Sequence, residues 1–373
     1  MRIAIFIGGF LPLYNGVVSY VIDIGTELSK RGHTGVVFAP KQKRGVKINI
    51  SKYPFKVIQF PSFPAIVYPE LRFTFPAFPT IVKELRLFHP DVVHTNDPMS
   101  ICTEGIAAAK LLHIPTVLTY HTFLFDKDMM KNLRFGEALF LFKQPLSVLN
   151  ARYHNIANAV ICPSEEAQRE LVHYGLQKPS YVINNGINLV SAQAAPLAGL
   201  DPLKKELRIV SQTRVAVFTG RLSADKKIDV LISAWPYVIR SFPNAKLLII
   251  GKGPCEDALR QQTQNLGIEQ QVIFTGGIAR EEIFRDGYYK LAHMFVSASA
   301  IENQSVAMIE AMANGLPLIC VKMRGTEELI QPAFGMLVSP DNPTALAAAI
   351  LKVMSQDTLR AAMSKAARLQ SMQ

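Results

Sequence analysis

Short apolar runs alternate with longer amphipathic stretches along the whole chain. The apolar runs are rich in β-branched residues, as expected of strands that are buried on both faces. The predicted strands are Ile3–Ile7, Gly35–Phe38, Val92–His94, Thr116–Thr119, Ala159–Cys162, Tyr181–Ile183, Val215–Phe218, Leu247–Ile250, Val272–Phe274, Met294–Val296 and Leu318–Val321. The predicted helices of the first half are Val17–Lys30, Ser100–Leu112, a long stretch around Lys131–Asn158, and Glu165–Tyr174. This alternation predicts an α/β protein with two facing, Rossmann-like, doubly wound domains.

A segment without hydrophobic periodicity separates the two sets of strands. Residues 192–199 are small and rich in Ala and Pro, which is typical of a connection. A length of 373 residues also fits two domains of ordinary size. We therefore place the first domain at residues 1–190 and the second at residues 191–373. Because ligands of open parallel sheets bind beyond the carboxyl ends of the strands, the expected active site is the cleft between the two sheets.

The composition indicates the cellular compartment of the protein. Hydrophobic residues make up 49% of it, which is enough for two cores. No apolar stretch reaches the roughly 18 to 20 residues of a membrane span, and the N-terminus looks like a buried strand rather than a signal peptide. The cysteines lack metal-ligand spacing, so small core residues in a reducing compartment are expected. The sequence therefore predicts a cytoplasmic protein.

Positive charge is concentrated in one early stretch. The net charge is +11, and no acidic residue lies between Glu27 and Glu70, whereas that stretch holds eight Lys or Arg residues. Such a field attracts anionic lipid headgroups or nucleic acid, although a solvated basic loop would have the same composition. Two segments that mix aromatic, apolar and basic residues, Pro61–Val82 and Lys131–Lys143, are either interfacial or ordinary core. Taken together, the three stretches favour contact with an anionic membrane surface and no nucleic-acid partner.

Two carboxylates lie eight positions apart near the C-terminal end of the chain. Glu302 falls in a predicted loop, and Glu310 falls about one and a half turns into the following helix. Between them, Gln304, Ser305 and Val306 form a helix start whose free amides and dipole favour an anion. An acid on either side of an anion site fits a ligand with hydroxyls at both ends and phosphate in the middle. A nucleotide-sugar has that shape.

The loop after the strand Val215–Phe218 holds two cations. Arg221 and Lys226 are five positions apart there, a spacing that can grip a diphosphate and stabilise a phosphate leaving group. A solvated basic loop is the alternative. In the first domain, Gly16 precedes a helix and allows close backbone approach to a ligand, or simply forms a strand-to-helix turn. His121 follows a buried strand and is able to bond a substrate hydroxyl, or is a structural histidine.

Metal binding is not expected. Asp126 and Asp128 formally match a D-x-D motif, but this motif is common by chance, and no other Asp, His or Cys cluster has ligand spacing.

Several motifs together resemble those of one enzyme family. The pair Glu302 and Glu310, followed by Ala311–Pro317, resembles the E-x7-E signature of retaining glycosyltransferases of the GT-B fold. Gly220-Arg221 with Lys226 resembles the diphosphate loop of that family. Further matching segments are Asn184–Asn188 and Gly335–Asp341. The segments Phe10–Val18 and Thr119–Thr122 look most like bacterial diacylglycerol glucosyltransferases, and phosphatidylinositol mannosyltransferases are close relatives.

The resemblance implies roles for the matching residues of the second domain. Glu302 would bond hydroxyls of the donor sugar, and Glu310 those of the ribose. Arg221 and Lys226 would hold the diphosphate, together with the backbone at Gln304, Ser305 and Val306. The backbone at Ile278 would hold the base. Ser305 departs from the family, in which glycine is usual at this position, and its side chain would crowd the phosphate.

In the first domain, Gly16 would approach the diphosphate, and His121 would bond the donor sugar near the reacting carbon. The resemblance thus implies a catalytic set of His121, Arg221, Lys226 and Glu302, with no essential metal or other cofactor.

The sequence therefore predicts a retaining glycosyltransferase that moves a hexose, glucose from UDP-glucose, to a membrane lipid such as diacylglycerol. Its second domain would bind the donor, and its first would bind the acceptor and the cytoplasmic face of the cell membrane. A transferase with a soluble or polysaccharide acceptor, a nucleotide-sugar 2-epimerase and a non-catalytic sugar-nucleotide binder remain alternatives.

Overall fold

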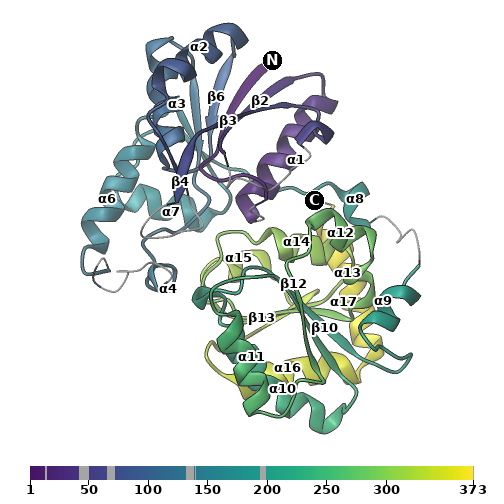
Figure 1. Ribbon diagram of the computed structural model, residues 1–373. Coiled ribbons are helices and arrows are strands. Elements are labelled where there is room, and N and C mark those ends of the chain that lie inside the picture. The colour runs from purple at the N-terminus through teal and green to yellow at the C-terminus, as the bar shows by residue number, and fades with distance from the viewer. Residues whose placement is uncertain are drawn as a thin grey trace. The chain divides into compact units, whose positions relative to one another are not determined.

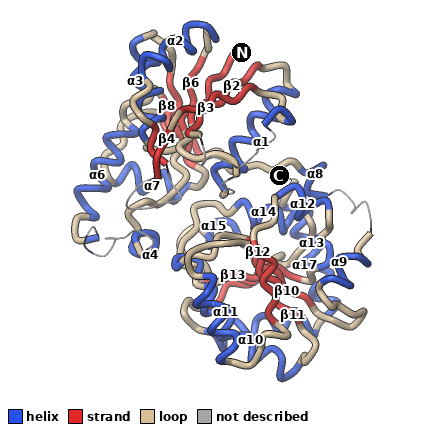
Figure 2. The backbone as a smooth tube through the Cα atoms, viewed as in Figure 1, coloured by secondary structure: helices blue, strands red, loops and turns tan. Residues whose placement is uncertain are grey.

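The computed structural model shows a chain that divides into two compact units, Met1–Gly186 and Ile187–Gln373 (Figures 1 and 2). The structure describes residues 1–12, 15–41, 50–64, 72–131, 138, 140–193 and 199–372. Each unit is built around its own parallel sheet.

The first unit contains a seven-stranded sheet in the order β3-β2-β1-β6-β7-β8-β9, with every neighbouring pair parallel. Its direction of winding reverses between β1 and β6, which makes it doubly wound. The strands are β1 (Arg2–Phe6), β2 (Thr34–Pro40), β3 (Lys56–Phe60), β6 (Val92–Thr95), β7 (Thr116–Thr119), β8 (Ala159–Cys162) and β9 (Ser180–Val182). A separate antiparallel hairpin joins β4 (Ser62–Pro64) to β5 (Arg72–Thr74).

Helices cover both faces of this sheet because alternate residues of its strands point to opposite sides. Ala4 and Phe6 of β1 pack with α2 and α3, and the Phe6 ring stacks on Phe38 at a centroid distance of 4.4 Å. Ile3 and Ile5 pack on the other face with α1. The helices are α1 (Gly16–Lys30), α2 (Phe78–Phe88), α3 (Ser100–Leu111), α4 (Lys127–Met130), α6 (Lys143–His154) and α7 (Glu165–His173), with a 3₁₀ turn η1 at Ile50–Lys52.

The second unit contains a six-stranded parallel sheet in the order β12-β11-β10-β13-β14-β15. This is the classic dinucleotide-fold order, with its reversal between β10 and β13. The strands are β10 (Val215–Thr219), β11 (Lys246–Ile250), β12 (Val272–Gly276), β13 (Met294–Ser297), β14 (Leu318–Val321) and β15 (Gly335–Val338).

Two apolar layers enclose the second sheet. One contains Trp235 of α10, which is fully buried, and residues of α16; the other contains residues of α13, α14 and α17. The helices of the second unit are α8 (Leu189–Gln193), α9 (Asp201–Glu206), α10 (Ile228–Ser241), α11 (Glu256–Asn265), α12 (Arg280–Arg285), α13 (Tyr288–Leu291), α14 (Val306–Ala313), α15 (Thr326–Leu329), α16 (Pro343–Ser355) and α17 (Asp357–Gln370), with a 3₁₀ turn η2 at Ala224–Lys226.

The prediction of two doubly wound, parallel-sheet domains is confirmed. Two details of the sequence-based interpretation are wrong. The long helix expected around Lys131–Asn158 is not continuous, because Leu141 and Phe142 form a turn before α6, which ends at His154. Residues 132–137 and 139 of that stretch lie outside the described part of the chain. The connection expected to be irregular starts with helical residues, since α8 extends to Gln193, whose side chain donates to Ala313 O at 3.0 Å. Residues 194–198 of that connection lie outside the described part of the chain.

Candidate functional site

The point at which the strand order of the second sheet reverses is surrounded by charged side chains. Parallel strands place their carboxyl ends at one edge, and the loops after the two central strands diverge there and leave room for a ligand. The loop after β10 brings Arg221 and Lys226 to this edge, and the loop after β13 brings Ser299 and Glu302. We call Arg221, Asp225, Lys226 and Glu302 the charged cluster.

Lys226 is the centre of the charged cluster. Its Nζ lies 2.7 Å from Glu302 Oε1, 3.4 Å from Ser299 Oγ and 3.6 Å from Asp225 Oδ2. The Arg221 guanidinium lies 3.7 Å from Asp225 Oδ1. Burial by itself would lower the pKa of Lys226, but Glu302 and Asp225 outweigh that effect and raise it. Lys226 is therefore a permanent cation, and the structure brings together three residues that the sequence singled out.

Asp225 stabilises the loop after β10. Its side chain is 1% exposed and accepts from Ser223 Oγ at 2.5 Å, while its backbone oxygen accepts from Ala300 N at 2.8 Å. The second bond ties the loop after β10 to the loop after β13. Sequence reasoning missed Asp225, although an acid directly before Lys226 was a visible signal.

Two glycines allow the neighbouring loop after β11 to pack against the charged loop. A Cβ on Gly251, which has a φ of +154°, would lie 1.8 Å from Gly220 O, and one on Gly253 would lie 2.3 Å from Leu222 O. Leu222 N donates to Lys252 O at 3.0 Å across this contact. Glycine is thus required at both positions, because backbone approaches backbone there.

Glu310 lies in α14, where the sequence placed it, and is 4% exposed. Tyr289 OH donates to its Oε2 at 2.9 Å, and Arg280 Nε forms a short ion pair with Oε1. Burial and the nearby carboxylate raise the pKa of Tyr289 well above its usual range. The phenol therefore keeps its proton and donates a hydrogen bond to Glu310. Sequence reasoning missed Arg280 and Tyr289.

The other residues predicted to bind the nucleotide-sugar lie in the segments next to Glu302 and Arg280. Ile278 lies between β12 and α12, two residues before Arg280. Gln304 and Ser305 lead into α14, which begins at Val306, and the Ser305 side chain makes no capping hydrogen bond to it. The loop before them is held by Glu302 N, which donates to Arg324 O at 3.1 Å.

In the first unit, the predicted histidine belongs to a neutral polar network at the end of β7. His121 Nε2 lies 3.1 Å from Asn96 Oδ1, and Asn96 Nδ2 donates to Phe6 O at 3.1 Å. This second bond orients the amide so that His121 Nε2 carries the proton, which leaves Nδ1 as an acceptor. The His121 ring packs edge-on against Tyr20 at a centroid distance of 4.6 Å.

Burial, and to a smaller extent His94, lowers the pKa of His121 to about 3. His94 itself is buried, with its pKa lowered to about 4 by desolvation, and its Nε2 lies 2.7 Å from Thr119 Oγ1. Both imidazoles are therefore neutral at physiological pH. Gly16 begins α1 and is exposed; the helix is capped by Asn15, whose Oδ1 accepts from Val18 N at 2.9 Å.

Among the described residues, no group of three or more His, Cys, Asp or Glu side chains is placed to hold a metal ion. The D-x-D pair has local structural partners: Asp126 caps α4 through Asp128 N at 3.0 Å, and Asp128 pairs with Lys131 at 2.5 Å. Within the same described ranges, none of the helices is both long and apolar enough to cross a bilayer.

Two family models match the chain in succession. The model described as Glycosyltransferase Family 4 matches residues 14–190, and the one described as Glycosyl transferases group 1 matches residues 201–370. The alpha-monoglucosyldiacylglycerol synthase of Streptococcus pneumoniae is 30% identical over 86% of this chain and 70% of its own length. The chain belongs to the group 1 glycosyltransferases of the GT-B fold. The resemblance stated from the motifs is thereby confirmed.

Other relatives of this glycosyltransferase are named for the transfer of glucose or of mannose. The alpha-monoglucosyldiacylglycerol synthase of Acholeplasma laidlawii is 28% identical over 86% of this chain and 80% of its own. The phosphatidyl-myo-inositol mannosyltransferase of Mycolicibacterium smegmatis is 26% identical over 97% and 86%. The crystal structure of Anabaena HepE in complex with UDP-glucose aligns over 100% of this chain and 94% of its own with a TM-score of 0.78, at 22% identity, and so shows the shared fold.

Proposed function

We propose that this glycosyltransferase is a retaining enzyme that transfers glucose from UDP-glucose to a membrane lipid such as diacylglycerol. The charged cluster at the reversal of the second sheet is the observation that carries the proposal. The names of the Streptococcus pneumoniae and Acholeplasma laidlawii relatives support a glucosyl-lipid product. We assign donor binding to residues 191–373 and acceptor binding to residues 1–190.

The charged cluster fits the departure of a nucleoside diphosphate. The bond between the anomeric carbon and the phosphate oxygen breaks, and the leaving group takes the electron pair. Arg221 and Lys226 stabilise the negative charge that develops on it, as fixed cations do in a water-poor site. Lys226 is held by Glu302 at 2.7 Å. Donor binding would exchange these partners, with phosphate on Lys226 and sugar hydroxyls on Glu302.

The acceptor hydroxyl attacks from the face that the diphosphate leaves, so that the anomeric configuration is kept. Its proton passes to the departing phosphate oxygen. No step requires a metal or another cofactor. His121, neutral and with Nδ1 as an acceptor, would bond a hydroxyl of the donor sugar, and Gly16 would leave space for the diphosphate.

Glu310 fits the ribose end of the donor. Its Oε1 pairs with Arg280 and its Oε2 accepts from Tyr289, and because a carboxylate oxygen accepts more than one hydrogen bond, Glu310 would also accept from the ribose hydroxyls. Backbone amides at Gln304, Ser305 and Val306 would hold the phosphates between the two acids, and the backbone at Ile278 would hold the base.

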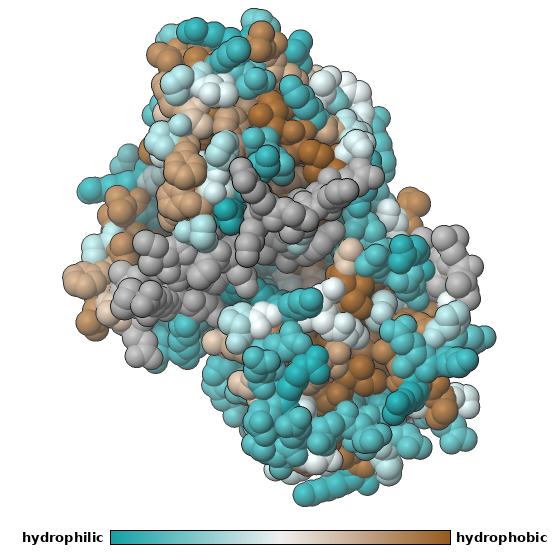
Figure 3. All heavy atoms as spheres, in the orientation of Figure 1, coloured by the Kyte–Doolittle hydropathy of each residue, from teal (hydrophilic) through white to brown (hydrophobic). Residues whose placement is uncertain are grey.

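Exposed apolar side chains of the first unit support membrane contact. Phe63 and Phe73 on the β4–β5 hairpin and Phe75 beside it are 42%, 38% and 54% exposed, with ring centroids 5.1 to 6.1 Å apart. A second apolar patch lies around α6, where Leu141 and Phe142 are 83% and 60% exposed (Figure 3). Aromatic side chains of this kind enter the interfacial region of a bilayer. Residues 42–49 of the acid-free stretch, residues 65–71, and residues 132–137 and 139 of the segment Lys131–Lys143 lie outside the described part of the chain.

A transfer assay with a panel of donors tests the proposal. Purified enzyme is incubated with UDP-glucose or GDP-mannose and with diacylglycerol in mixed micelles, since several relatives are named GDP-mannose-dependent alpha-mannosyltransferases. We expect glucosyl-diacylglycerol with an α linkage by NMR from UDP-glucose. A β-linked product would refute the retaining assignment. A mannosylated product would refute glucose as the transferred sugar, and a water-soluble product would refute the lipid acceptor. Donor binding without transfer or hydrolysis would instead support a non-catalytic binder.

A further inference from the structure

A polar cavity opens in the second unit, with a volume of about 410 Å³. It is lined by the segment before β13, the end of α14 and one face of α17. His293 precedes β13 and lines the cavity, whereas Ser299 and Glu302 follow that strand and lie at the charged cluster. The cavity and the charged cluster are therefore at opposite ends of β13. A strand of four residues is about 13 Å long.

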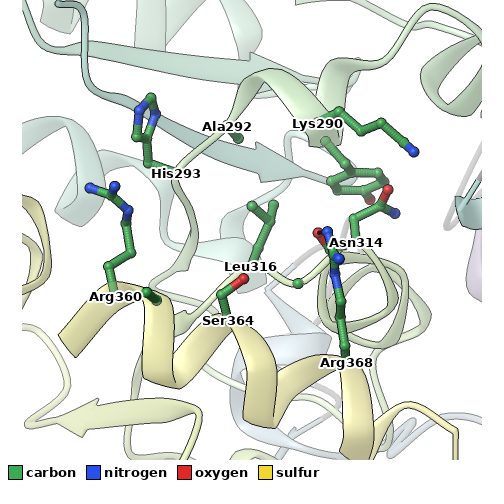
Figure 4. A pocket seen from close by; sticks show the side chains of 11 residues that line it. Lys290, Ala292, His293, Asn314, Leu316, Arg360, Ser364 and Arg368 are labelled. Atoms are coloured by element: carbon green, nitrogen blue, oxygen red, sulfur yellow. Dashed lines mark hydrogen bonds between the residues drawn. The ribbon is translucent and has the colours of Figure 1, made fainter. Parts of the chain in front are cut away.

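The cavity is strongly basic. Arg360, Ser364 and Arg368 line it from successive turns of α17, because residues four apart lie on one face of a helix. Figure 4 shows both arginines rising from this helix, one beneath His293 and the other beside Asn314, with Ser364 between them. Lys290 of α13 completes the rim. Within the described ranges, no carboxylate lines the cavity.

Two of these cations have only backbone carbonyls as partners. Lys290 Nζ donates to Gln193 O at 2.7 Å, and Arg368 Nη2 lies 3.5 Å from Asn314 O. No carboxylate in the part of the chain that the structure describes pairs with either of them. Arg360 is different, since it pairs with Asp357 at 2.6 Å. Burial lowers the pKa of Lys290 and Arg368 lowers it further, so the two charges repel one another and would both be stabilised by an anion.

A glycine keeps the space in front of Arg368 and Ser364 open. Gly315 follows α14 with a φ of +75°, and a Cβ there would lie 2.5 Å from Arg368 Nε and 2.9 Å from Ser364 Oγ. A larger residue would push both groups back. The cavity volume falls within the range of about 300 to 1,000 Å³ found for small-molecule sites, and it exceeds what a single inorganic phosphate fills.

We propose that this cavity is a second ligand site, which binds an organic phosphate through Arg368, Lys290 and Ser364. The ligand carries a phosphate monoester or diester, the group that arginine and lysine bind most strongly as cations. A soluble phosphorylated metabolite and the headgroup of an anionic phospholipid share this chemistry. The inference is independent of the proposed transfer reaction, because it uses none of the donor residues.

The test measures binding and needs no activity. Glycerol 3-phosphate is titrated into the whole chain by calorimetry, and co-sedimentation with phosphatidylglycerol vesicles is measured in parallel against phosphatidylcholine vesicles. The pocket variant is K290Q/R368Q. Its control, K352Q/K365Q, removes two exposed lysines of α16 and α17 that do not line the cavity. A second variant, S364F, fills the cavity and keeps its charges.

We expect the pocket variant and S364F to bind at least about tenfold more weakly than the wild type and the control, in one or both arms. An effect on glycerol 3-phosphate identifies a soluble ligand, and an effect on vesicles alone identifies a lipid headgroup. Equal binding by all four proteins would overturn the proposal. So would glycerol 3-phosphate binding that only R221A abolishes, since this would place the ligand at the charged cluster. Thermal unfolding of each variant controls for misfolding.

Discussion

The two units share the same strand order over six strands, with β9 as a seventh in the first unit, but they have different side chains at the reversal point. In the second unit this edge carries buried and half-buried charges, namely Arg221, Asp225, Lys226 and Glu302. In the first unit the corresponding edge carries the neutral groups His94, Asn96 and His121. One carboxyl, Asp97, also lies there, and its oxygens accept from the backbone amides of Gly8 and Met99. The fold thus fixes where a ligand binds, and the side chains at that edge decide what is bound. Charges suit a diphosphate, whereas neutral donors and acceptors suit hydroxyls.

The first prediction is that acid unfolds the first unit before the second. Burial lowers the pKa of His94, His121 and His154 in the first unit to between about 3 and about 4, and that of His293 in the second to about 4. Each folded pKa lies below the unfolded value of about 6.5, so the unfolded state binds more protons, and stability is lost as the pH falls below 6.5. Between pH 7 and pH 5, each such histidine costs on the order of 2 kcal/mol.

The single tryptophan separates the two units experimentally. Trp235 is fully buried in the second unit, so its fluorescence reports on that unit alone. We expect the protection of amides in β1, β6 and β7, corrected for the intrinsic pH dependence of exchange, to fall at pH 5, while Trp235 fluorescence stays native. Simultaneous loss of both signals would mean that the neutral histidines do not set the acid stability of the first unit.

The second prediction concerns charge at the reversal point. Replacing Arg221 with Ala should lower kcat/KM by about 10² to 10³, or ~3 to 4 kcal/mol, because a fixed cation that stabilises the leaving group is lost. Glu302→Gln should have a similar effect, since it removes the negative charge that pairs with Lys226 and replaces one of the two acceptor oxygens for sugar hydroxyls with an NH2 donor. Lys352→Ala, an exposed substitution in the same unit, should leave kcat/KM unchanged. Near-normal turnover by folded Arg221→Ala enzyme would contradict the assignment of the charged cluster.

Features set by neighbouring residues could be predicted from the sequence, and features set by residues far apart in the chain could not. The buried strands were predictable because their apolar runs are continuous, as in Val215–Phe218. The helix α2 was missed because it begins with Phe78 and Pro79 inside a segment rich in aromatic residues and proline, which conceals the helical period. The edge strand β3 was missed because Lys56–Phe60 is short and only its last residue is buried.

The polar residues around the carboxyl end of the second sheet were predicted in part. Arg221, Lys226 and Glu302 are parts of local motifs, so each could be found within a few residues. Arg280 and Tyr289 could not, because their interaction with Glu310 spans 30 and 21 positions and exists only once α12, α13 and α14 pack together. Contacts of this kind are set by tertiary structure.

The third prediction tests whether the loop geometry matters as much as the charge. Gly251→Ala places a Cβ 1.8 Å from Gly220 O, directly before Arg221, and forces the two backbones apart. We expect about a tenfold loss in kcat/KM, ~1.4 kcal/mol, mainly through a raised KM for the donor. Gly267→Ala is the matched control, because Gly267 also has a positive φ but nothing lies within 4 Å of its Cβ position. If both variants lost activity equally, general strain rather than displacement of Arg221 would be the cause.

The smallest predicted effect concerns the exposed aromatic side chains of the first unit. Phe73 and Phe75 are 38% and 54% exposed, so only part of each ring remains to be buried at an interface. With ~25 cal/mol gained for each Å² of apolar surface, Phe73→Ser and Phe75→Ser should each weaken vesicle binding only a few-fold. Co-sedimentation with phosphatidylglycerol vesicles measures this, and Tyr237→Ser, a 40% exposed aromatic of the second unit, is the control. An equal loss in the control would show that membrane contact does not distinguish the two units. A loss confined to the first unit would place the edge that we propose to bind hydroxyls and the lipid surface on the same half of the chain, as an enzyme with a lipid acceptor requires.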